Sequence, residues 1–140
     1  MEQHIREMSS AMQCRVQSQR DWVRGHFVPG SEWKYSSIDG KLYLLEGILS
    51  KGLVEADETW KLQSLGITFG DALAERLHLN WVEVEDEYGI DPALRYGSSS
   101  VLAFPLTMIS KRIGRGDTVD VRELFDGVAE MLAETIAKSS

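Results

Sequence analysis

Apolar residues recur every three or four positions in five segments of the chain, which is the spacing of a helix with one buried face. In the first segment this apolar stripe comprises Ile5, Met8, Met12, Val16 and Val23. Glycine, proline or serine residues separate the segments and are typical of helix ends and turns. The pattern therefore predicts helices over residues 3–26, 36–51, 56–78, 106–114 and 119–138.

Between the third and the fourth predicted helix, the apolar period changes from helical to alternating. Residues 81–88 alternate, which indicates a strand, and residues 94–96 and 101–104 are candidates for two more. The links between them are too short for a crossover helix, so an antiparallel meander is expected. The sequence thus predicts an α+β fold in which a small three-stranded antiparallel sheet, about residues 81–104, is packed by about five helices.

Glycines mark two places in this scheme. Gly89, followed by Asp91-Pro92, predicts the turn between the first two strands. Gly66 and Gly70 lie inside the predicted third helix, where each costs about 1 kcal/mol relative to alanine. Two such glycines four residues apart predict the close approach of another backbone.

The composition is that of an ordinary globular protein, with 140 residues, 43% hydrophobic and 26% charged. This length suits one domain, and residues 1–140 are expected to form a single one. The lone Cys14 cannot form an internal disulfide, and no secretory signal or membrane-spanning stretch is recognisable, so a cytoplasmic location is expected. The net charge of −7 disfavours nucleic acid as a partner and favours a basic protein.

The strongest chemical feature is a run of five carboxylates, namely Glu83, Glu85, Asp86, Glu87 and Asp91. Alternation would place the three glutamates on one strand face, where like charges repel one another. Three interpretations stay open: a solvated face, a docking surface for a basic protein, and a site for a hard cation, which would need converging oxygen ligands.

Two aspartates are predicted to be buried and structural. Asp86 should share its strand face with valines that seek the core, so its carboxylate needs an ion pair with Arg95 or hydrogen bonds from turn amides. Asp71, which follows the two helical glycines, likewise needs an ion pair or hydrogen bonds if it is buried. A functional acid with a raised pKa is the alternative for Asp86.

Motifs for catalysis are missing. No nucleophile elbow or phosphate-binding loop occurs, and His4, His26 and His78 are scattered without metal-ligand spacing. Neither a catalytic residue, a metal site nor a cofactor is therefore predicted.

Three stretches carry a family pattern: a glycine-punctuated segment at residues 65–74, a Trp-led acidic segment at 81–94, and a Phe-Pro-containing segment at 104–113. Together they resemble a bacterial family catalogued only as a domain of unknown function. The resemblance covers roughly residues 60–128. It implies the fold and a bacterial origin, and it brings no activity, substrate or catalytic residue.

The function expected from these features is non-enzymatic protein binding, in its sharpest form a bacterial immunity protein that blocks a basic toxin domain through an acidic surface. The expected contact residues are Trp81, Glu83, Glu85, Glu87, Tyr88, Asp91 and Arg95. Two alternatives stay open: a housekeeping adaptor or homo-oligomer with aromatic anchors, and an enzyme that uses Glu85, Asp86 or Asp91 with a divalent ion.

Overall fold

A computed structural model describes residues 3–139 and confirms the α+β class. Five α-helices, two 3₁₀-helices and four strands alternate along these residues. In chain order they are β1 (His4–Arg6), α1 (Ser10–Arg24), η1 (Glu32–Ser36), α2 (Ile38–Ser50), α3 (Thr59–Leu77), β2 (Asn80–Asp86), β3 (Gly89–Arg95), β4 (Leu102–Ala103), η2 (Pro105–Thr107), α4 (Ser110–Gly114) and α5 (Val121–Ser139).

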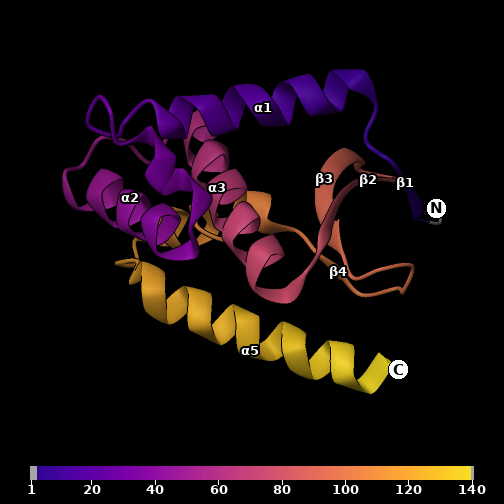
Figure 1. Cartoon of the computed structure of the whole chain (residues 1–140). Helices are drawn as coiled ribbons and strands as arrows, with labels where there is room; N and C mark the ends of the chain where they lie inside the picture. The colour runs from indigo at the N-terminus through magenta and orange to yellow at the C-terminus, as the bar shows by residue number, and fades with distance from the viewer. Residues whose placement is uncertain (1–2, 140) are drawn as a thin grey trace.

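The central element is α3, which lies between α1 on one side and α5 on the other (Figure 1). Its side chains from Leu62 to Leu73 are almost all buried. Phe69 of α3 meets Phe125 of α5 edge to face, with 5.8 Å between ring centroids. Burial of this apolar surface is the main stabilising term for the fold.

The sheet has four antiparallel strands in the order β1-β2-β3-β4, one more than the sequence predicted. The missed strand is β1, in which Ile5 pairs with Val84 of β2. The predicted helix over residues 3–26 therefore begins only at Ser10, where the Ser9 hydroxyl accepts a hydrogen bond from the N–H of Met12 and caps α1. Ile5 fitted the helical stripe, and a three-residue strand is too short to show its own period.

The turn between β2 and β3 lies at residues 87–88, and the predicted turn at Asp91-Pro92 is wrong. Pro92 lies inside β3 opposite Glu83. Proline is tolerated there because β4 pairs only with Leu94 and Arg95, which leaves β3 as the edge of the sheet at Pro92.

Gly66 confirms the predicted close approach of a backbone. A Cβ at this position would lie 2.5 Å from the carbonyl oxygen of Pro105 and 2.6 Å from that of Leu106. At Gly70 the neighbours are side chains instead, because a Cβ would meet the rings of Pro105 and Trp81. The two glycines thus let η2 and β2 pack directly on α3.

The helix ends differ from the predicted ones by a few residues. Ser37 caps α2 through the N–H of Gly40, and His78 ends α3 in the left-handed conformation with a φ of 57°. The predicted helix over 106–114 is divided into η2 and α4. Within residues 3–139, none of the helices combines the length and the apolar character that crossing a bilayer requires.

Candidate functional site

The buried carboxylate on β2 is Glu83, which is 2% exposed. Its Oε2 accepts a hydrogen bond of 2.7 Å from Arg6 Nε, and its Oε1 accepts one of 2.7 Å from the backbone N–H of Ser9. The Ser9 N–H, followed by the Arg6 guanidinium, holds the pKa of Glu83 below its usual range. Glu83 therefore ties β1 and the start of α1 to the sheet and leaves little for a partner to bind.

The acidic residues near the end of the β2–β3 hairpin lie at the surface. Tyr88, at its turn, is 88% exposed, and Glu87 beside it is exposed and forms no ion pair or side-chain hydrogen bond within residues 3–139. Glu85 is half-buried, and its Oε1 lies 3.0 Å from Arg6 Nη1. Ile90, opposite Glu85, adds an exposed apolar side chain.

A cleft of about 320 Å³ adjoins this hairpin. Asp86, Tyr88, Asp91 and Pro92 line one part of it, and η2, its preceding residue Phe104 and Gln63 of α3 line another. Asp86 is half-buried and accepts a hydrogen bond of 2.8 Å from the backbone N–H of Tyr88, as the turn-capping alternative predicted. The cleft thus combines two carboxylates with two aromatic rings.

Two of the predicted contact residues, Trp81 and Arg95, are half-buried and hydrogen-bonded within the chain. Arg95 does not pair with Asp86, because its guanidinium donates to the carbonyl oxygens of Ser98 and Ser99 at 2.8 and 2.6 Å. Trp81 is half-buried, and its indole N–H points to α3. The structure therefore brings Glu85, Glu87, Tyr88 and Asp91 to the hairpin end, whereas Glu83 is buried and Trp81 and Arg95 are half-buried.

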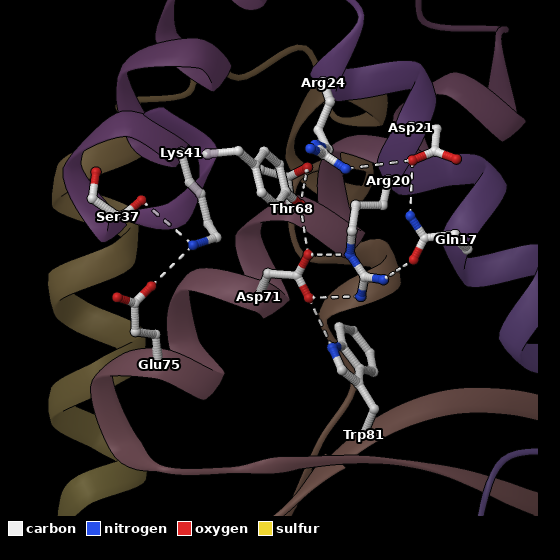
Figure 2. A network of polar contacts seen from close by, with 11 residues as sticks. Gln17, Arg20, Asp21, Arg24, Ser37, Lys41, Thr68, Asp71, Glu75 and Trp81 are labelled. Carbon is white, nitrogen blue, oxygen red and sulfur yellow. Dashed lines mark hydrogen bonds and ion pairs between the residues drawn. The ribbon is translucent and has the colours of Figure 1, made fainter. Parts of the chain in front are cut away.

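Asp71 is the centre of a second polar cluster, drawn in Figure 2. Its carboxylate accepts two hydrogen bonds from Arg20, at 2.7 and 2.9 Å, one from Tyr35 at 2.5 Å and one from the indole of Trp81 at 2.9 Å. The Asp71 and Arg20 side chains are only 12% and 21% exposed. The cluster thus links α1, η1, α3 and β2 through the Asp71 side chain.

The same cluster fixes the ionisation of Tyr35. Burial, followed by the neighbouring Asp71 carboxylate, raises the pKa of the Tyr35 phenol well above its usual range. Tyr35 is therefore a neutral donor to Asp71, and the hydroxyl of Thr68 lies 3.1 Å from its phenol oxygen. Lys41 lies nearby on α2, with its ammonium 2.9 Å from Glu75 and 5.1 Å from the Tyr35 ring centroid.

Within residues 3–139, histidine, cysteine, aspartate and glutamate side chains form no group of three or more that could hold a metal ion. Asp86 and Asp91 are the two carboxylates that line the hairpin cleft. Cys14 is exposed on α1.

The fold and these two clusters define a domain of the α+β class. The chain belongs to the family described as Domain of unknown function (DUF3806), whose model matches residues 41–125. This confirms the resemblance read from the sequence.

Three individual proteins are also similar to this chain. Imidazoleglycerol-phosphate dehydratases of Synechococcus elongatus and of a second Synechococcus strain are each 33% identical over 90 residues, covering 59% of this chain and 43% of those proteins. A crystal structure from Bacteroides thetaiotaomicron matches with a TM-score of 0.72 at 12% identity, covering 91% of this chain and 47% of that one. The chain therefore spans less than half the length of each, and the structural likeness shows the fold alone.

Proposed function

We propose that this domain binds a basic protein through the end of the β2–β3 hairpin. The observation that carries the proposal is the exposure of Tyr88 among carboxylates at the hairpin turn. A large aromatic side chain left in solvent is typical of an interface anchor rather than of a core residue. Its exposure leaves it free to pack against a partner.

The charges around this anchor favour a cationic surface. Glu87 and Asp91 have no cationic partner within residues 3–139, and Glu85 remains partly exposed beside Arg6. The chain as a whole carries a net charge of −7. Complementary charge accelerates the encounter with a partner and selects against acidic competitors.

Apolar contacts at the same place would supply affinity. Ile90 and Phe104 are partly exposed near Tyr88, and the cleft of about 320 Å³ offers a recess for one side chain of the partner. An arginine or lysine suits this recess, because its stem can pack on an aromatic ring while its charge meets Asp86 or Asp91.

The sharpest form of this proposal is an immunity protein that covers the basic active-site cleft of a toxin domain. A small acidic domain that engages such a cleft through one hairpin would block access of an anionic substrate. An adaptor that uses the same hairpin on another basic protein is the broader form.

The test is retention of a basic protein from the native host's lysate at low and at moderate salt. The test variant is Glu85→Gln/Glu87→Gln/Asp91→Asn, which removes three charges from the hairpin. The matched control is Asp126→Asn/Glu130→Gln/Glu134→Gln, which removes three exposed charges from α5. Glu83 stays unchanged in both because it holds the fold together.

We expect one basic protein to be retained by the wild type and the α5 variant, to be lost by the hairpin variant, and to be released as salt rises. Equal retention by both variants, or retention of copies of this chain alone, would overturn the proposal. Turnover of imidazoleglycerol phosphate by the purified chain, unchanged in the hairpin variant, would favour an enzyme instead.

A further inference from the structure

A second cleft, of about 520 Å³, is lined by α2 and the segments next to it. In Figure 1, α2 lies at the end of the molecule away from the sheet. Its walls are α2, the segment after α1 and the turn that follows α2. The buried side chains of Leu44 and Ile48 line it, together with the half-buried Phe27. Its volume lies within the usual range for small-molecule sites, and its lining is mostly apolar, as is usual for such sites.

Large apolar side chains around this cleft are left in solvent. Val28 is 72% exposed, Tyr43 64% and Leu53 46%, and all three line the same cleft. Apolar side chains scattered singly on a surface need no explanation, but three that converge on one cleft indicate a binding surface.

Gly47 is the second observation. It lies within α2, where glycine costs about 1 kcal/mol relative to alanine, and a Cβ at this position would meet no atom within 4 Å. Gly40, in the same helix, is required by close packing, because a Cβ there would collide with the carbonyl of Lys34. Packing does not require Gly47, which lines the cleft, so the missing side chain keeps the cleft open.

The charges at this cleft are opposite to those of the whole chain. Lys34 and Lys51 line it, and neither forms an ion pair within residues 3–139, although the chain has 22 acidic residues. The one acidic residue in the lining, Glu46, is held by Arg122 at 2.9 Å. The Lys34 ammonium lies 5.9 Å from the centroid of the Trp33 ring, so it has an aromatic neighbour but no counter-charge. An apolar cleft with two ammonium groups that lack a counter-charge complements a ligand that is both apolar and anionic.

We propose that this cleft binds an amphipathic organic anion, with its aliphatic or aromatic body on Leu44 and Ile48 and its carboxylate between Lys34 and Lys51. This site is separate from the hairpin and goes beyond the proposed protein binding. The cleft takes the apolar body out of water, and the two ammonium groups select the anionic end.

The test uses decanoate as the probe, at concentrations below micelle formation, with ¹⁵N-labelled full-length chain observed by NMR. Decyltrimethylammonium, which has the same tail and the opposite charge, is the ligand control. Gly47→Leu is the blocking variant, since it fills the cleft without removing a contact of the fold. Gly127→Leu is its matched control, because Gly127 is a helical glycine of α5 with open space around its Cβ and lies outside this cleft.

We expect decanoate to shift the amide signals of residues 44–53 in a saturable way in the wild type and in Gly127→Leu, and to leave them unmoved in Gly47→Leu. Replacing both lysines by glutamine should weaken binding about fivefold per lysine, which is the factor given by about 1 kcal/mol of exposed ion pair. No saturable shift with decanoate, an equal shift in Gly47→Leu, or equal binding of the cationic control would overturn the proposal.

Discussion

Replacing Asp71 by asparagine removes the negative charge on which Arg20, Tyr35 and Trp81 converge. Both carboxylate oxygens accept two hydrogen bonds each, and Arg20 donates to both oxygens. Asparagine offers one oxygen and one N–H₂ group in the same space. At one of the two oxygen positions, the two N–H or O–H donors that now bind Asp71 would face the N–H₂ group of asparagine. The guanidinium of Arg20 would also lose its counter-charge.

The expected cost follows from burial. Because the Asp71 and Arg20 side chains are only 12% and 21% exposed, water can replace the lost partner only in part. Removing one member of a buried ion pair costs about 3–5 kcal/mol. A domain of this size has a total stability of about 7–20 kcal/mol, so the variant should lose a large share of it. The midpoint of thermal unfolding should fall by about 10 °C or more.

The assay is urea unfolding at pH 7 followed by tryptophan fluorescence, with circular dichroism as the second probe. Asp126→Asn is the control, since Asp126 is exposed on α5 and should change stability by less than about 0.5 kcal/mol. A loss of less than about 1 kcal/mol in Asp71→Asn would refute the reasoning. It would mean that the ion pair with Arg20 contributes no more than a surface pair does.

Other predictions concern packing and pH. Gly66→Ala should lower the free energy of unfolding in urea by about 1–3 kcal/mol, because its methyl group meets backbone carbonyls. Gly47→Ala should raise it by up to about 1 kcal/mol. A change of the same sign in both variants would contradict the packing argument. The Ser9 N–H and then the Arg6 guanidinium lower the pKa of Glu83 in the folded state. The stability that Glu83 contributes is therefore present above the unfolded pKa of about 4.3 and is lost as pH falls. Glu83→Gln should therefore flatten the acid side of a stability–pH curve, and an unchanged acid side would contradict this. Burial and then Asp71 raise the pKa of Tyr35 in the folded state. The stability that Tyr35 contributes is therefore present below about pH 10 and is lost as pH rises. Tyr35→Phe should reduce the loss of stability on the alkaline side of the stability–pH curve.

The longer helices were predictable because a buried face repeats through more than three turns. The sequence placed α2, α3 and α5 within a few residues of their observed bounds. It also predicted the close backbone contact at Gly66, because an unfavourable residue in a helix needs a reason in packing. β1 was not predictable from its own residues, since its position depends on pairing with β2, which lies more than 70 residues away in the chain.

The candidate site was predicted less well, for a physical reason. Alternation along β2 divides its residues between two faces, but it does not show which face packs against a helix. The valine face was expected to be buried together with Asp86. In the structure both faces of β2 are covered at its middle, since Val84 is 1% and Glu83 2% exposed, so that Glu83 is a buried carboxylate, whereas Asp86 is half-buried and caps the turn. Arg6, the partner of Glu83, is visible in the sequence. Nothing in the sequence shows that these two residues lie close together in the fold.

The pattern of charges also shows how the matched region depends on the residues before it. Asp71 and Glu83 both lie within residues 41–125, which the family model matches. Their counter-charges, Arg20 and Arg6, lie on α1 and β1, outside that match. Buried carboxylates are stable only when they are paired. The first segments therefore supply the arginines that pair with two carboxylates of the family core.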